Sequence, residues 1–159
     1  MHGLDGVALA PDDPHGKDAD TEPIHTAHLI ALGMWLGVVI TEVLFEFTAS
    51  DADALRAAAR FHYNVDKYGE LPILAAVLFT GGILAARAWP WTPLHILKIG
   101  LSLIAVSLAV ICTIWVFRRR GIHDVETLLG FRRRIWTLAA VATVFATPAL
   151  FLGLAYFRG

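Results

Sequence analysis

Four long apolar runs, separated by short polar stretches, dominate the sequence. They cover residues 28–47, 70–86, 93–117 and 135–157. A helix needs about 20 mainly apolar residues to cross the hydrocarbon core of a bilayer. Three runs reach this length directly, and the second reaches it when Tyr63 to Glu70 belongs to the same helix. The pattern therefore predicts four transmembrane helices, over residues 27–48, 55–87, 93–118 and 133–157.

The composition supports a membrane protein. Hydrophobic residues make up 57% of the chain, charged residues make up 17%, and the mean hydropathy is +0.61. A soluble domain has about 45–50% apolar and about 25% charged residues. We therefore expect an all-α fold, an integral membrane four-helix bundle that runs up-down-up-down in the lipid bilayer. The net charge of −1 gives no reason to expect binding to nucleic acid.

Residues 1–24 differ from the rest of the chain. They are acidic and contain several prolines and glycines, and such a segment buries too little apolar surface to order itself. We therefore predict a disordered acidic tail over residues 1–24, followed by a four-helix transmembrane domain over residues 25–159.

The distribution of arginines predicts the orientation in the membrane. Three arginines end the third apolar run at 118–120, and three precede the fourth at 132–134. Cytoplasmic loops of membrane proteins carry the excess of Lys and Arg. We therefore place this Arg-rich loop in the cytoplasm and both termini outside, in a multi-pass protein of the cell inner (plasma) membrane.

The candidate functional site lies around the first helix–helix connection. Ionisable side chains within a membrane cost about 2.5–3.5 kcal/mol each on insertion scales, and they mark functional sites. Residues four apart share one helix face, and the predicted antiparallel pairing brings the two faces to the same depth. Pro72 lies in the second of these helices and predicts a bend there. The residues expected to converge are Glu42 and Glu46 before the connection, and His62, Asp66 and Glu70 after it.

Our first hypothesis for this site is a metal centre. Carboxylates and imidazole on facing helices bind metal ions in bundle cores, and mostly oxygen ligands with one nitrogen suit Fe, Mn or Zn. The site has enough carboxylates for one ion, or for a dinuclear centre. Its role is open between redox chemistry on a lipid-soluble substrate such as a quinone, metal transport and metal sensing. In the first case the chain is a membrane metal-dependent oxidoreductase.

Two other functions remain open. His28 and His95 open the first and third helices at similar depth, so they form a candidate haem b site of a quinone-linked membrane cytochrome. Lys98 joins them in this second candidate site. Chains of Asp, Glu and His also mark proton and cation pathways, so a transporter subunit is the other alternative. Because four helices are few for a transporter, we expect such a subunit to work as a homo-oligomer.

A purely structural role is the remaining interpretation of the acidic residues. In that case they are neutralised by nearby cations, or stay protonated and bond the first helix to the second. The cations expected to neutralise them are Arg56, Arg60 and Lys67.

Overall fold

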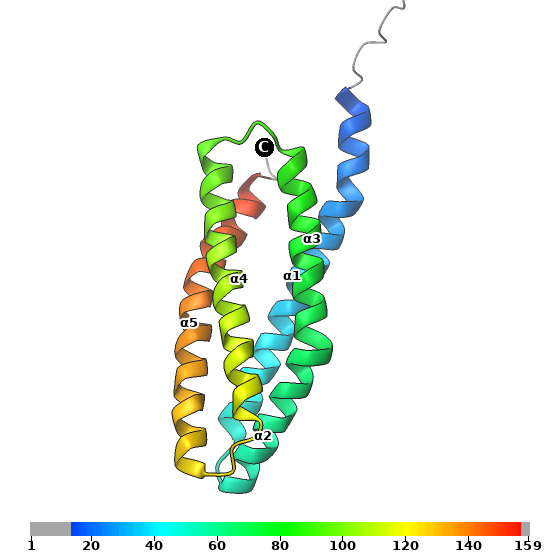
Figure 1. Cartoon of the computed structure of the whole chain (residues 1–159). Coiled ribbons are helices and arrows are strands. Elements are labelled where there is room, and N and C mark those ends of the chain that lie inside the picture. Colours follow the sequence, from blue (N-terminus) through cyan, green and yellow to red (C-terminus); the bar gives the residue numbers. More distant parts are fainter. Residues whose placement is uncertain (1–13, 157–159) are drawn as a thin grey trace, which may run out of the picture.

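The computed structural model describes residues 14–156, which are helical apart from short connections (Figure 1). The first long helix is α1 (Pro14–Thr48). The second is continuous through three segments, α2 (Ala52–Val65), the π-helical turn η1 (Asp66–Glu70) and α3 (Leu71–Arg87). The chain then forms α4 (Pro93–Arg119) and α5 (Val125–Tyr156).

Within residues 14–156, four helical stretches are long and apolar enough to cross a membrane. They are Glu22–Thr48, Ala52–Arg87, Pro93–Arg119 and Val125–Leu154, with mean hydropathies of 1.9, 1.7, 2.5 and 1.9. The prediction of an all-helical protein with four such helices is therefore confirmed.

Three helices begin earlier than predicted, α2 by three residues and α1 and α5 by more than two turns. α1 starts at Pro14, within the segment predicted as a disordered tail, and residues 1–13 lie outside the described residues. α5 starts at Val125, because Asp124 accepts hydrogen bonds from the backbone N–H and the hydroxyl of Thr127 and so caps its first turn. The acidic and basic residues before the fourth apolar run thus belong to the helix.

The arrangement of large and small residues is that of a protein surrounded by lipid. Many large apolar side chains point outward, with exposed fractions of 72% for Phe79, 68% for Val144 and 58% for Ile30. The interior contains mostly small residues, which let helix backbones approach closely in a membrane. The buried alanines are Ala31, Ala49, Ala58, Ala59, Ala105, Ala109, Ala142 and Ala149.

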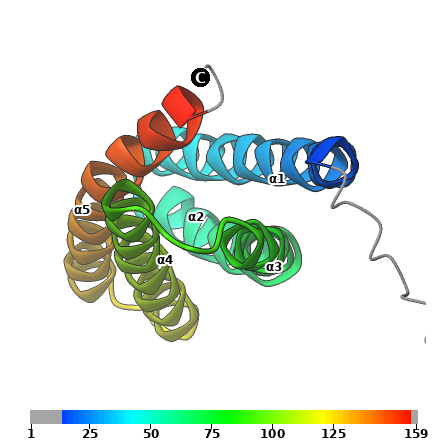
Figure 2. The same ribbon diagram turned by 90° about the horizontal axis from the view of Figure 1, so that it is seen from above.

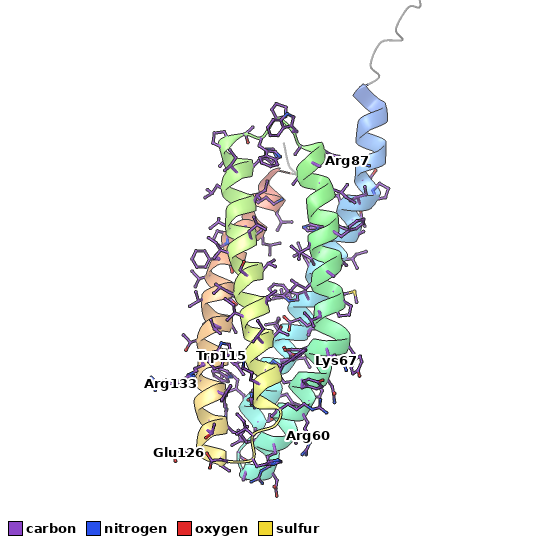
Figure 3. All side chains as sticks on the ribbon, in the orientation of Figure 1. Arg60, Lys67, Arg87, Trp115, Glu126 and Arg133 are labelled. Carbon is purple, nitrogen blue, oxygen red and sulfur yellow. The ribbon has the colours of Figure 1, made fainter. Side chains whose placement is uncertain are left out.

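The helices pack as two pairs, α1 along α3 and α4 along α5, and α2 contacts α1, α4 and α5. We call the end where the α1–α2 and α4–α5 connections lie the Arg-rich end, at the bottom of Figure 1. Arg60 and Arg133 lie there, whereas Arg87 lies at the opposite end (Figure 3). Towards that opposite end, α1 stays along α3 but diverges from α5, and its first turns extend beyond the bundle (Figures 1 and 2).

Aromatic pairs join the helices near the Arg-rich end. Phe45 of α1 stacks on Phe61 of α2, with ring centroids 4.4 Å apart. Phe47 of α1 packs against Trp136 of α5 at 4.1 Å. Such pairs stabilise by about 0.5–1.5 kcal/mol beyond the area they bury. They fix α1 between α2 and α5 at the depth of the candidate site.

Candidate metal centre

The five residues predicted to converge are all buried in the interior of the bundle. We call them the acid–histidine cluster, and their exposed fractions lie between 1% and 7%. α1 contributes two, α2 one and η1 two. Among the described residues, only Thr113 and Arg119 are buried polar residues outside the cluster. The members are Glu42 (4%), Glu46 (2%), His62 (7%), Asp66 (1%) and Glu70 (7%).

The π-helical turn explains how Asp66 and Glu70 face the same way. Pro72 has no N–H to donate to a carbonyl four residues earlier. The helix widens just before it, and the N–H of Leu71 donates to the carbonyl of Asp66, five residues back. The wider turn brings residues four apart closer to alignment than an α-helix does. The distortion expected from Pro72 is therefore a π-turn that aims both carboxyl groups inward.

His62 is the centre of the cluster. Its Nε2 lies 3.1 Å from Oε2 of Glu42 and 3.7 Å from Oδ1 of Asp66. On the other side of the ring, Nδ1 lies 3.4 Å from Oε1 of Glu46. One imidazole thus faces two carboxyl groups with one nitrogen and a third carboxyl group with the other.

Three residues have the geometry of a metal-ligand set. Ligand atoms from Glu42, His62 and Asp66 all lie within 4.8 Å of one another. Zn–O and Zn–N bonds are about 2.0–2.2 Å long, so a small contraction would bring all three atoms onto one ion. Neither carboxyl oxygen of Asp66 has a hydrogen-bond partner among the described residues, and the same holds for Oε1 of Glu42. Buried oxygens without partners are costly, so this donor set fits a cation.

Two arginines meet the cluster at the Arg-rich end. Nη1 of Arg119 donates to Oε1 of Glu46, and Nε of Arg132 lies 3.8 Å from Oε2 of the same carboxylate. Arg119 is completely buried. From the sequence we assigned its positive charge to a cytoplasmic loop, and that is wrong for this side chain. It points into the bundle because the small-residue face of α4 continues to it.

Helical phase could have identified Arg119. Fourteen residues separate it from the buried Ala105, which leaves them about 40° apart on the helix at 100° per residue. Arg118 lies about 140° from Ala105 by the same count, and its guanidinium is over the ring of Trp115 instead. The angle of each arginine relative to the small-residue face of α4 therefore distinguishes the buried Arg119 from the exposed Arg118.

Glu70 has a separate partner. Oε1 of Glu70 accepts a hydrogen bond of 2.9 Å from the indole N–H of Trp35 in α1. No sequence pattern pairs these two residues, because a Trp in a transmembrane helix is ordinarily an interfacial or packing residue. The bond places Glu70 on the side of the cluster away from Arg119.

A cavity of about 60 Å³ adjoins the cluster. Its polar lining comes from Glu42, Glu46, His62 and Glu70, and its apolar lining from α1, α4 and α5. One water occupies about 30 Å³ in the liquid, so the space suits a group of a few atoms. The apolar wall consists mainly of Val39, Val43, Ala109, Ile135, Ala139 and Ala142.

The second candidate site is spread over several elements. Nδ1 of His28 bonds Oγ1 of Thr80 in α3 at 2.8 Å. His95 forms a capping box with Thr92 at the start of α4. Lys98 lies against Gly153 of α5, where a Cβ would meet its Nζ at 3.1 Å. Each side chain is thus engaged by a different neighbour, and the haem b site stays a prediction.

Among the described residues, none of the three cations expected to neutralise the acids forms an ion pair with the cluster. Arg56 pairs with Asp53 at 2.9 Å. Lys67 is exposed and lies over the ring of Tyr68, and Arg60 is exposed. Within the described part of the chain, the cations that reach the cluster are Arg119 and Arg132, from the other side of the bundle.

Comparisons of the chain with protein-family models, with curated proteins and with solved structures found no match.

Proposed function

We propose that this chain is an integral membrane metalloprotein that binds one divalent transition metal ion, Fe, Mn or Zn, inside the bundle. The ligands are Nε2 of His62 and carboxylate oxygens of Glu42 and Asp66. The observation that carries the proposal is the set of unpartnered oxygens on these two carboxyl groups, beside an imidazole nitrogen. Oxygen donors with one nitrogen favour these metals over Cu(I).

Charge balance supports a divalent ion. The four carboxylates of the cluster carry four negative charges when ionised, and Arg119 and Arg132 carry two positive ones. One divalent cation makes the assembly neutral while His62 remains a neutral ligand. Neutrality matters here because uncompensated charge in a low-dielectric interior is strongly unfavourable.

Glu46 orients the histidine in this proposal and does not bind the ion. Metal-ligating histidines usually donate their other ring N–H to a carboxylate, which fixes the tautomer and the ring orientation. Glu46 faces Nδ1 of His62 and is itself held by Arg119. The order Arg119–Glu46–His62 thus points Nε2 at Glu42 and Asp66. We therefore favour a mononuclear centre over a dinuclear one.

The surroundings favour chemistry at the metal over passage of a cation. A cation leaving through the Arg-rich end would have to pass Arg119 and Arg132, which repel it. Three protein ligands leave a coordination position open, as catalytic metal sites do, and the cavity adjoins the same residues. With Fe or Mn bound, we propose metal-dependent redox chemistry as the role of the centre, since Zn²⁺ is redox-inert.

We propose the orientation from the arginine distribution. The helices run up-down-up-down in the inner (plasma) membrane, the Arg-rich end faces the cytoplasm, and both termini are outside. The metal centre then lies in the inner half of the bilayer.

Metal content of purified protein tests the proposal. We expect about one equivalent of Fe, Mn or Zn by elemental analysis, and near-complete loss in His62→Ala, Glu42→Gln and Asp66→Asn. Glu126→Gln is the control, because Glu126 lies outside the cluster near the Arg-rich end (Figure 3). Unchanged metal content in the three ligand variants would refute the assignment. A Soret band in the visible spectrum would replace it with the haem b alternative.

Glu46→Gln distinguishes orientation from ligation. An outer-shell variant typically loses about 10–100-fold in metal affinity. We therefore expect this variant to keep its metal at saturating concentration and to release it to a weaker chelator than the wild type does. Loss of all metal at saturation would make Glu46 a ligand.

A further inference from the structure

The cavity beside the cluster opens between two helices that separate away from the Arg-rich end. α1 and α5 are joined at the Arg-rich end through Phe47 and Trp136. Beyond that contact α1 follows α3 and diverges from α5 (Figures 1 and 2). The lining residues of the cavity continue along both helices past this contact, to Trp35 on α1 and Thr143 on α5.

The depth of the opening determines whether it faces lipid or water. Thr143 lines the cavity and is exposed. It lies nine residues beyond Arg134, which is about 14 Å along an α-helix. The hydrocarbon core is about 30 Å thick, so with Arg134 at the interface Thr143 is near the middle of the membrane. An opening at this depth meets lipid chains and not water.

The unpaired polar atoms that line the cavity determine which ligand group can bind there. The indole N–H of Trp136 is buried and has no acceptor among the described residues. Oε2 of Glu46 is a buried oxygen of a lining residue that does not bind the metal, and it accepts no hydrogen bond among the described residues. A hydroxyl group meets both needs, because it accepts from an N–H and donates to a carboxylate.

We propose that the cavity admits a lipid-soluble phenol or quinol from the bilayer, between α1 and α5, to the metal centre. The hydroxyl enters the 60 Å³ space, and the apolar remainder stays between the helices and in the lipid. This inference rests on the proposed metal centre for the chemistry that follows binding. The access route itself depends only on the cavity.

Cys112 reports on the route because it lines the cavity and is the only cysteine in the chain. We would reconstitute the full chain in lipid nanodiscs, where both aqueous faces are accessible. N-cyclohexylmaleimide, which dissolves in lipid, should modify Cys112, whereas a sulfonated maleimide should not. Comparable reaction with the sulfonated reagent would overturn the proposal. Reaction with neither, when the unfolded protein does react, would overturn it as well.

A matched pair of ligands tests recognition of the hydroxyl. 4-Nonylphenol should slow the modification of Cys112 by N-cyclohexylmaleimide, and its methyl ether should need about a tenfold higher concentration for equal protection. Tenfold is the loss expected for one hydrogen bond to a charged acceptor. Equal protection by the two compounds, or none by either, would overturn the proposed ligand class.

A matched pair of variants tests the location. Ala139 lines the cavity, whereas Ala140 is exposed on the neighbouring face of α5. Ala139→Phe should fill the space and abolish protection by 4-nonylphenol, and Ala140→Phe should leave protection unchanged. Equal behaviour of the two variants would overturn the location. Metal content measured in the same samples separates the proposals, because absent metal with intact protection contradicts only the metal centre.

Discussion

The ion pair between Arg119 and Glu46 should dominate the stability of the bundle near the Arg-rich end. Arg119→Met keeps an unbranched side chain but leaves the carboxylate of Glu46 buried without its closest cation. Removing one partner of a buried ion pair costs about 3–5 kcal/mol. One kcal/mol shifts Tm by about 2–4 °C in a chain of this length, so we expect a decrease of about 6–20 °C. Arg132, at 3.8 Å, should keep the effect towards the lower end.

Thermal unfolding in detergent micelles measures this effect, and a double-mutant cycle assigns it to the pair. Glu46→Gln combined with Arg119→Met removes both charges, so the double variant should be more stable than Arg119→Met alone. Arg118→Met is the control, since Arg118 is exposed and lies over Trp115. The reasoning fails if Arg119→Met and Arg118→Met shift Tm equally, or if the two changes in the cycle are simply additive.

Two further predictions concern other parts of the fold. Alanine usually stabilises a helix interior by about 0.5–1 kcal/mol relative to glycine. Gly81→Ala should not show this increase in stability, because its Cβ would lie 3.1 Å from Cε1 of His28. Gly82→Ala, with nothing within 4 Å, should keep that gain, and equal Tm values for the two variants would contradict the contact. At the start of α5, hydrogen bonds from Thr127 lower the pKa of Asp124 from its ordinary value of 3.8. The carboxylate therefore stabilises this helix end above pH 3.8, and the stabilisation is lost as pH falls through the lowered pKa. The protection of first-turn amides from exchange should follow this pH dependence in the wild type and not in Asp124→Asn.

Much of the architecture and of the candidate site was accessible from residue pattern alone. Apolar run length predicted the four spanning helices, because lipid requires a continuous stretch that satisfies its own backbone hydrogen bonds. The burial of Glu42, Glu46 and the three residues that face them followed from i, i+4 spacing on both sides of one short connection. The assignment of these residues as metal ligands was not testable in this way and stays a prediction.

The contributions of α4 and α5 were not accessible from local pattern. Arg119 and Arg132 come from a part of the chain more than 70 residues away from Glu46, and charge counting treated both as loop residues. Their pairing depends on how the two helix pairs dock, which spacing within one helix does not encode. The bond from Trp35 to Glu70 has the same origin, since it joins α1 to the π-turn.

The π-turn at Asp66–Glu70 also sets the rotational phase of everything that follows it in the same helix. A π-turn holds one residue more than the α-turn it replaces, and one residue corresponds to a rotation of about 100°. Deleting a residue there would swing Thr80 and Gly81 away from His28 on α1. The π-turn therefore aligns the carboxyl groups of the cluster and also sets the α1–α3 contact at Thr80 and Gly81. A change in the turn would disturb both the proposed metal centre and the helix packing almost three turns away.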